Sequence, residues 1–560
     1  TLSLARLGPG GHLCFRVLEQ KVKRRCEMNP GRRLLVGTIM ALLGASAATG
    51  QQKAREFEKL GQVHFPISCT AEAQKQFDRA TALLHSFWFD ASAKGFAAVI
   101  QTDPGCAMAH WGIAMTLLGN PFAWPPAPKA LEDGWAAAKK ANAAEAKTAR
   151  ELDYIAAIEV FYRDSDKVDH RTRALAYAKA MEQVYLRYPD DREAAVFYAL
   201  ALNATALPTD KTYANQLKAA GILEKVFAEQ PNHPGAAHYL IHSYDYPPIA
   251  SRGLSAARRY AGIAPSAPHA LHMPAHIFTR QGFWQESIES NRASKAAATN
   301  HFDQLHAMDY LTYAYLQGAQ DVAAKRVLDE MNGIGKVNKE HLVTAYALAA
   351  IPARYALERR RWTDAASLKP AEREFPWSRY PQAEALIYFA RALGSARTRD
   401  TDGARKATEK LQSLRDDLVK ANQTYWADQV EIQRRGAAAW LSRAEGRNDE
   451  ALQLMRSAAD LEDTTEKHPL TPGPIVPAHE LLGDLLLELN EPGEALKEFE
   501  TSFLKEPNRF HGIYGAARAA ELSGDQEKAK TYYTKLVTLC EHADSERPEL
   551  QQAKAFLAKK

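Results

Sequence analysis

The feature that most constrains this chain of 560 residues is a repeat with a period of 34 residues. Its clearest copy begins at His479 and places small and large residues at fixed offsets: Leu482-Gly483, Ala495, Phe499 and Pro507. Thirty-four residues later, the equivalent places hold Ala516-Ala517, Ala529 and Tyr533. A unit of this length cannot bury its apolar face alone, so consecutive copies have to stack on one another.

This pattern resembles the tetratricopeptide repeat (TPR) superfamily, whose small residues let two antiparallel helices approach while large ones fill the gap between neighbouring pairs. Phe96 followed by Asp103-Pro104 gives the same ending near the start of the chain, and weaker copies cover 323–327, 362–366 and 448–458. The resemblance implies an all-α, TPR-like α-solenoid, a right-handed superhelix of antiparallel helix pairs. Its concave groove would hold a peptide, a partner protein or a small ligand.

The residues between these copies favour helix throughout. They are rich in Ala, Leu, Glu, Lys and Arg, they are punctuated by Pro and Gly, and they contain no run of alternating β-branched residues. Pro-rich loops at 121–128, 370–381 and 468–477 interrupt the pattern. The last two predict a division into an N-terminal solenoid (48–368), middle repeats (382–467) and C-terminal repeats (476–560). The first loop is predicted either to fold over the groove or to act as a rigid connector.

The N-terminal segment reads as a secretory signal ahead of the mature chain. Met28 begins a basic stretch with Arg32-Arg33, an apolar run covers 34–43, and Ala45-Ser46-Ala47 resembles a cleavage site. The apolar run is too short to cross a bilayer, so no membrane span is expected in the mature chain. We therefore expect residues 1–27 to be upstream sequence ahead of the start at Met28, residues 28–47 to be removed as the signal, and the protein to be periplasmic or secreted.

The charge of the remaining chain argues against a nucleic-acid partner. The first 47 residues carry eight of the 71 Lys and Arg and two of the 67 Asp and Glu, which leaves 63 basic against 65 acidic residues, a net charge of −2. A near-neutral chain lacks the basic surface that contacts with phosphate groups require.

Three cysteines remain after residue 47: Cys69, Cys106 and Cys540. In an oxidising compartment, Cys69 and Cys106 would bridge the first repeat to the second. Two buried free thiols are the alternative, and neither interpretation is catalytic.

The histidines between positions 233 and 306 repeat with the period of the solenoid. His238 and His242 are four residues apart and share one face of a predicted helix, with Asp245 on the same face. Adding 34 gives His272 and His276, and adding 34 again gives His306 and Tyr310. These places are therefore equivalent positions in the first helices of three consecutive repeats.

In the TPR family, the equivalent places line the groove, so the resemblance implies that seven residues point inward: His238, His242, Asp245, His269, His272, His276 and His306. Neighbouring helix axes lie about 8–10 Å apart, a gap that two imidazoles can bridge through one ion bound about 2 Å from each nitrogen. One ion is then expected between His238, His242, His272 and His276, or two ions if the other three residues contribute. Donors of this type suit Zn, Cu, Ni or Fe rather than Mg or Ca.

Two observations bear on this prediction. Pro274 forbids an uninterrupted helix from His269 to His276, so His269 and His272 are predicted to lie on a turn that leads into a helix starting at Pro274. The periodic histidines also fit a simple alternative, in which duplication spread hydrogen-bonding groups along the groove without any metal. The segment His269–Phe278 (HALHMPAHIF) resembles one found in exported bacterial TPR proteins.

Three functions are consistent with the sequence. The first is an exported binding protein with a histidine-bound metal in its groove. The second is a metal-dependent hydrolase or oxidoreductase, with Asp245 or a histidine that binds no metal as acid or base. The third is an assembly scaffold without metal. An open coordination position facing a pocket would favour the enzyme over the binding protein.

Overall fold

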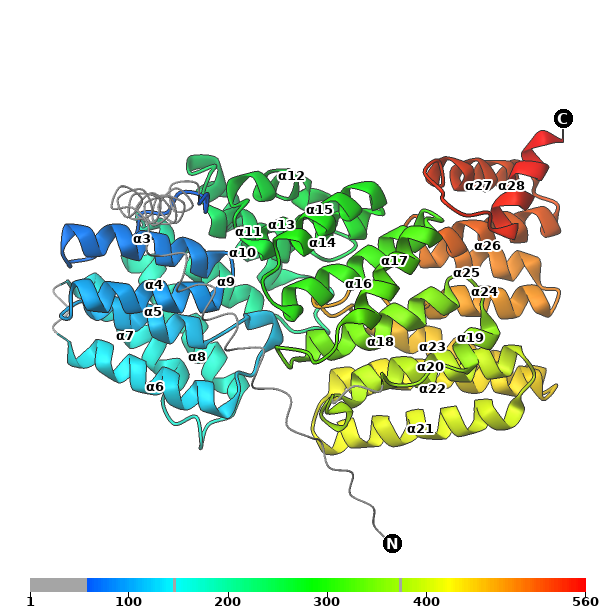
Figure 1. Ribbon diagram of the computed structural model, residues 1–560, viewed down its shortest axis with the longest axis horizontal. Helices are drawn as coiled ribbons and strands as arrows, with labels where there is room; N and C mark the ends of the chain where they lie inside the picture. Colours follow the sequence, from blue (N-terminus) through cyan, green and yellow to red (C-terminus); the bar gives the residue numbers. More distant parts are fainter. Residues whose placement is uncertain (1–57, 145–147, 372–374, 560) are drawn as a thin grey trace, which may run out of the picture. The chain divides into compact units, whose positions relative to one another are not determined.

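The computed structural model describes residues 58–144, 148–371 and 375–559, and these residues form helices joined by turns, with no strand among them (Figure 1). The predicted all-α fold is confirmed. Contacts divide the chain into Thr1–Lys59 and Leu60–Lys560, and everything described below belongs to the second unit. The predicted signal segment lies outside the described residues.

The α-helices of the second unit are α3 (Ala71–His85), α4 (Phe89–Thr102), α5 (Ala107–Leu117), α6 (Pro128–Ala143), α7 (Ala149–Tyr162), α8 (His170–Arg187), α9 (Arg192–Ala204), α10 (Ala214–Glu229), α11 (Pro234–Tyr244), α12 (Leu254–Ile263), α13 (Pro268–His272), α14 (Pro274–Gln281), α15 (Trp284–Ala297), α16 (His301–Gln317), α17 (Asp321–Gly333), α18 (Leu342–Leu357), α19 (Trp362–Ala366), α20 (Pro381–Arg397), α21 (Thr401–Lys420), α22 (Thr424–Ala444), α23 (Asn448–Thr464), α24 (Ala478–Glu488), α25 (Pro492–Ser502), α26 (Phe510–Ser523), α27 (Gln526–Leu539) and α28 (Pro548–Ala558). Short 3₁₀ helices are η1 (Pro121–Ala123), η2 (Ala250–Gly253) and η3 (Trp377–Arg379).

The helices pack as consecutive antiparallel pairs, and the predicted repeat explains how. Helix α25 packs against both α24 and α26, and Phe499 of α25 lies between them. A Cβ atom placed on Gly483 of α24 would lie 2.7 Å from the Phe499 ring, and one on Gly515 of α26 would lie 2.3 Å from it. Glycine at both places therefore makes room for the large residue between neighbouring repeats.

The same contact recurs at the N-terminal end of the unit. Phe96 of α4 is fully buried, and a Cβ atom on Gly112 of α5 would lie 2.4 Å from its ring. Phe96 precedes Gly112 by sixteen residues, as Phe499 precedes Gly515. The recurrence shows that both ends of the unit use one packing rule, that of a TPR-like α-solenoid.

The histidine-bearing helices have the spacing that the sequence predicts. The first helices of three consecutive pairs are α11, the α13–α14 segment and α16, and their partners are α12, α15 and α17. The break at Pro274 is confirmed, because α13 ends at His272 and α14 begins at Pro274. His269 and His272 lie on the short helix α13 rather than on a bare turn.

The first Pro-rich loop lies against this region. The Asn120 side chain accepts a hydrogen bond from the Phe122 amide and so begins η1. The Trp124 indole nitrogen donates to the Leu118 carbonyl and ties the loop back to the end of α5. Phe122 then stacks on the ring of His242, with ring centres 3.9 Å apart.

Cys69 and Cys106 form a disulfide with their Cα atoms 5.4 Å apart. Cys69 precedes α3 and Cys106 caps the start of α5, so the bond links the first helix pair to the second.

The segment that includes the third Pro-rich loop packs back onto the histidine-bearing repeats. The Lys467 ammonium lies 2.9 Å from a carboxylate oxygen of Asp245, and the Arg354 guanidinium donates to the carbonyls of Gly473 and Pro474. The predicted division at the Pro-rich loops stays a prediction. Within the described residues, no helix combines the length and apolar character needed to cross a membrane.

Candidate metal centre

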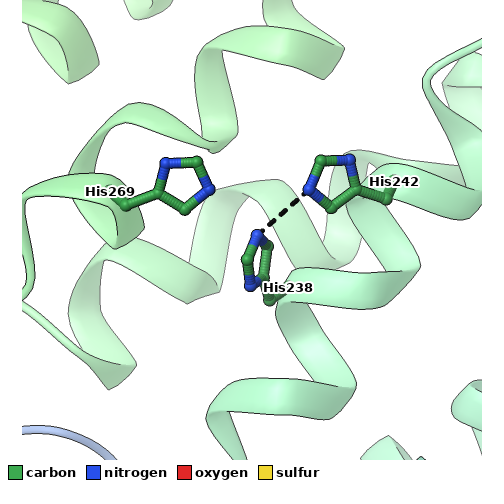
Figure 2. Close-up of side chains that lie close together, drawn as sticks. All are labelled: His238, His242 and His269. Atoms are coloured by element: carbon green, nitrogen blue, oxygen red, sulfur yellow. Dashed lines mark hydrogen bonds between the residues drawn. The ribbon is translucent and has the colours of Figure 1, made fainter. Parts of the chain in front are cut away.

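The six predicted histidines meet in two sets of three. The first histidine set consists of His238, His242 and His269, and the second histidine set consists of His272, His276 and His306. Within each set, one ring nitrogen from every residue lies within 4.8 Å of the others. Figure 2 shows the first set, with a nitrogen of each ring directed toward a common point.

This partition differs from the single ion predicted between His238, His242, His272 and His276, and it is closer to the predicted alternative of two ions, although Asp245 joins neither set. The i and i+4 histidines of one repeat meet through their own Nε2 atoms, at 3.1 Å in both repeats. The ring centres of His242 and His276, in contrast, are 5.9 Å apart. Because the pairs close within each repeat, the third member of each set comes from the neighbouring first helix: α13 supplies His269 and α16 supplies His306.

In the first set, a backbone hydrogen bond determines which ring nitrogen of His238 carries the proton. Its Nδ1 donates to the carbonyl oxygen of His85 at 2.6 Å, so its Nε2 carries a lone pair. The Nε2 atom of His269 is buried and has no hydrogen-bond partner in the described part of the chain. The set therefore has at least one nitrogen free to bind an additional group.

In the second set, hydrogen bonds determine the protonated nitrogen and the ring orientation of two histidines, His272 and His276. The Nδ1 of His272 donates to Oδ1 of Asn291 at 2.6 Å, and the Asn291 amide is oriented by its own donation to the Ser287 carbonyl. The Nδ1 of His276 donates to Oδ2 of Asp245 at 2.8 Å. Both Nδ1 atoms thus carry hydrogen, as is usual for metal-binding histidines held by an outer acceptor.

The two Nε2 atoms of His272 and His276 consequently face each other at 3.1 Å. Two bare lone pairs at this distance repel, so a cation must lie between them, either a proton or a metal ion. Two nitrogens bound tetrahedrally to one Zn-sized ion at about 2.0–2.1 Å lie about 3.3 Å apart. The observed separation is close to this value, and His306 supplies a third nitrogen within 4.8 Å of the other two.

Burial favours the neutral, metal-binding form of His238, His269 and His306. It lowers the pKa of His238 and of His306 to about 3, and it holds the pKa of His269 well below its ordinary value. Neighbouring histidines add to the effect, because a second positive charge among them is unfavourable.

Asp245 does not belong to either set. Its Oδ2 accepts from His276 and from Lys467, and its Oδ1 accepts from Arg280 at 3.2 Å. Burial alone raises the pKa of a carboxyl group, but His276 and Arg280 hold the pKa of Asp245 below its ordinary value. The carboxylate therefore orients His276 and is balanced by two cations.

A third histidine cluster contrasts with the two sets. His85 and His233 each contact one oxygen of Glu193, at 2.8 and 2.9 Å. The remaining nitrogen of His85 lies 3.1 Å from the Tyr239 hydroxyl, and that of His233 accepts from the Ala236 amide. Every ring nitrogen is paired, so this cluster is a satisfied buried network.

A cavity of about 210 Å³ adjoins both sets. Histidines from each set line it, as do aromatic residues from three segments of the chain: His242, His269, His276, His306, Phe87, Trp88, Phe89, Phe122 and Phe302. Each set offers three nitrogens, and the remaining coordination position of an ion there would face this space.

Sequence reasoning missed the residues that hold the histidines in place. Asn291 lies in the second helix α15, and only the packing of α13 on α15 brings it to His272. Lys467 lies 222 residues from Asp245. Neither residue carries a spacing signal in the sequence.

No family model matches the chain, and no curated protein matches it. The fold is of the tetratricopeptide type. Among solved structures, a tetratricopeptide repeat protein from Parabacteroides merdae shares 13% identity over 52% of this chain and 98% of its own length, with a TM-score of 0.26. Yeast Tom70 shares 10% identity over 87% of this chain and 95% of its own, with a TM-score of 0.32.

A third structure, Naa15/Naa10 bound to HypK-THB, shares 12% identity over 86% of this chain and 72% of its own length, with a TM-score of 0.24. TM-scores this low carry no argument of their own. The assignment of the TPR-type solenoid rests on the chain's own helix pairs and on the Phe-to-Gly packing between them.

Proposed function

We propose that this protein is an exported TPR-type solenoid that binds transition-metal ions in its two histidine sets and presents them to a small ligand in the adjoining cavity. The observation that carries the proposal is the pair of Nε2 atoms of His272 and His276, which face each other at 3.1 Å with both Nδ1 atoms already donating. Such a pair needs a cation, and a third imidazole nitrogen within 4.8 Å suits a metal ion better than a shared proton.

The donor type restricts the metal. Imidazole nitrogens suit Zn, Cu, Ni and Fe, whereas Mg and Ca prefer oxygen donors. The nearest carboxylate, Asp245, already accepts from His276, Arg280 and Lys467. The proposal therefore assigns Asp245 an orienting role rather than the acid or base role that the sequence suggested.

The cavity favours a metal-dependent enzyme as the second candidate. Structural metal sites are closed by four protein ligands, whereas catalytic sites keep three ligands and an open position. Each histidine set has three members, and four of the six histidines line the cavity. A buried site of this kind fits a small ligand better than a peptide, and the groove partner stays a prediction.

The disulfide between Cys69 and Cys106 supports the exported location in this proposal. Disulfides persist in secreted and periplasmic proteins and are rare in reducing compartments. An oxidising compartment agrees with the predicted signal segment.

The proposal is tested by metal uptake. Purified protein is freed of metal with a chelator and titrated separately with Zn²⁺, Cu²⁺, Ni²⁺, Fe²⁺ and the spectroscopic probe Co²⁺, and the bound metal is measured by elemental analysis. His272→Ala and His276→Ala should each weaken binding at the second set at least tenfold, and the double variant should add little, because both residues serve one site. His542→Ala, at a side chain 62% exposed, is the matched control and should bind like the wild type.

Failure of the wild-type protein to take up any of the four metals would contradict the proposal. The His272–His276 pair would then share a proton, and the metal-free scaffold would be the remaining function.

A further inference from the structure

We propose that the two histidine sets together hold a pair of copper(I) ions, and that this pair binds one molecule of dioxygen on the cavity side. This inference rests on the proposed metal binding and adds the oxidation state of the metal, the number of ions and the ligand.

The first step is that the two sets form one cluster. The ring centres of His242 and His276 are 5.9 Å apart, and those of His269 and His272 are 6.1 Å apart, although each of these pairs belongs to different sets. Each histidine of the first set also interacts electrostatically with a histidine of the second. Helix α11, which carries His238 and His242, packs directly on α14, which carries His276.

The second step is that both sets open onto the same space. His242 and His269 of the first set, and His276 and His306 of the second, line one cavity. Two ions with three imidazoles each would therefore have their open positions side by side. In two-metal sites, ions about 3.5–4 Å apart act jointly on one ligand.

The third step concerns charge. All six donors are neutral imidazoles, and no carboxylate joins either set. The nearest carboxylate, Asp245, is balanced by Arg280 and Lys467, whose side chains are only 2% and 6% exposed. Two divalent ions would add four positive charges to a buried region in which Arg280 and Lys467 already neutralise the carboxylates of Asp245 and Glu506.

The idealised cost of burying an ion rises with the square of its charge, so a monovalent ion costs about a quarter as much as a divalent one. Among the four metals that suit these donors, copper is the one with a stable monovalent form. Copper(I) also accepts three-coordinate geometry and binds imidazole. The donor sets therefore favour two copper(I) ions, with a total charge of +2.

The fourth step is that dioxygen binding preserves this charge. Each copper(I) ion gives one electron, dioxygen takes both to become peroxide, and two copper(II) ions with one bridging peroxide again carry +2. No proton and no external reductant is needed for this step. Phe87, Phe122 and Phe302 line this cavity beside polar residues such as Asp303 and Lys339, and its volume of about 210 Å³ accommodates a diatomic molecule.

Phe122 also holds the first set in place. Its ring stacks on His242 with centres 3.9 Å apart and an angle of 20° between the planes. Phe87 packs against His238 and His269, with ring centres 4.4 and 5.5 Å away. These contacts keep the imidazoles directed toward the same point before any ligand arrives.

The experiment is anaerobic loading with copper(I), followed by exposure to dioxygen. We expect two copper ions per chain by elemental analysis and consumption of one dioxygen for every two copper ions. The oxygenated protein should develop a charge-transfer absorption band but show almost no copper(II) signal by electron paramagnetic resonance, because the two spins couple. X-ray absorption should show a copper–copper distance.

Variants that remove one set at a time test the pairing. His238→Ala with His269→Ala should leave about one copper per chain, and so should His272→Ala with His306→Ala. Both should lose dioxygen uptake almost completely, since a single copper(I) supplies only one electron. The matched control is His64→Ala with His542→Ala, two exposed histidines outside the sets, which should retain two copper ions and full uptake.

Wild-type measurements decide the inference even if a variant fails to fold. One copper per chain, or two copper ions that consume no dioxygen, overturns it. If Zn²⁺ or Co²⁺ binds while copper(I) does not, the proposed metal binding is supported and the proposed copper pair is contradicted. If no metal binds at all, both fall together.

Discussion

At the residue scale, the position of each proton decides what a histidine cluster can do. In the network of His85, Glu193 and His233, every nitrogen has a partner, and the cluster needs nothing else. In the second set, Asn291 and Asp245 accept hydrogen bonds from the Nδ1 atoms of His272 and His276. The Nε2 lone pairs of the two rings therefore face each other. The two clusters have similar compositions, but only the second requires a cation.

Asn291 gives the first prediction. Asn291→Leu removes the acceptor for His272 Nδ1, so the ring loses its orientation and the second set should bind Zn²⁺ or Co²⁺ about 10–100-fold more weakly. Asn291→Asp keeps an acceptor at the same place and should restore most of the affinity. Competition against a chelator of known affinity measures both effects, and equal affinities for Leu and Asp would show that the contact does not orient the ligand.

Glu462 gives a prediction on pH. Burial raises the pKa of this carboxyl to about 7 in the folded protein, above its ordinary value of 4.5. The folded state thus holds a proton that the unfolded chain releases, and this stabilisation is complete below about pH 4.5 and is lost as pH rises to about 7. Glu462→Gln keeps an acceptor for the Ala478 amide and removes the titration.

The stability of Glu462→Gln relative to the wild type should therefore increase between pH 5 and pH 7.5. Urea unfolding at several pH values measures the difference. A difference that stays constant across this range would contradict the assigned pKa of Glu462.

At the element scale, single residues set where helices end and how closely they approach. Pro274 ends one helical segment and begins the next, which places His272 on α13 and His276 on α14 while their Nε2 atoms still meet. Gly483 and Gly515 let neighbouring helices approach closely, because each leaves room for the Phe499 ring. A helical glycine with open space around it, such as Gly221, has no such role.

A matched pair of glycines tests this packing rule. Gly515→Ala would place its Cβ 2.3 Å from the Phe499 ring, and we expect a loss of about 1–3 kcal/mol of stability from overpacking. Gly221→Ala lies in the exposed interior of α10 with no atom within 4 Å and should gain about 0.5–1 kcal/mol, because alanine favours helix. Thermal unfolding should therefore move in opposite directions, and a shift of the same sign in both variants would contradict the packing account.

At the scale of the whole molecule, contacts between distant segments hold the candidate centre. Lys467 and Arg280 fix Asp245, and Arg280 in turn contacts Glu506 across 226 residues. The Tyr310 hydroxyl, beside the second set, donates to the Thr471 carbonyl. A change in the C-terminal half can therefore alter the histidine sets.

The disulfide gives a prediction at this scale. Cys69 and Cys106 are 37 residues apart, and a closed loop of this length contributes about 3–4 kcal/mol by chain entropy. In Cys69→Ser with Cys106→Ser, amide hydrogen exchange should accelerate over α3 to α5, since a solenoid loses stability locally. Exchange in α26 and α27 is the internal control and should not change, and uniform acceleration along the chain would argue for a single cooperative unit.

The sequence by itself determined the elements that depend on local rules. The 34-residue period gave the helix pairs, the i and i+4 spacing put His238 with His242 and His272 with His276, and Pro274 gave the helix break. These features follow from helix geometry within one repeat, so they can be read from neighbouring residues.

The tertiary structure decided how the histidines were grouped and what surrounds them. The sequence favoured one ion shared across two repeats, whereas the packing of α13 and α16 gave each repeat its own third histidine. The outer partners Asn291 and Lys467, and the cavity wall at Phe122, come from other helices and loops. No local spacing encodes such contacts, because they depend on how whole helices pack and on which side-chain conformations that packing allows.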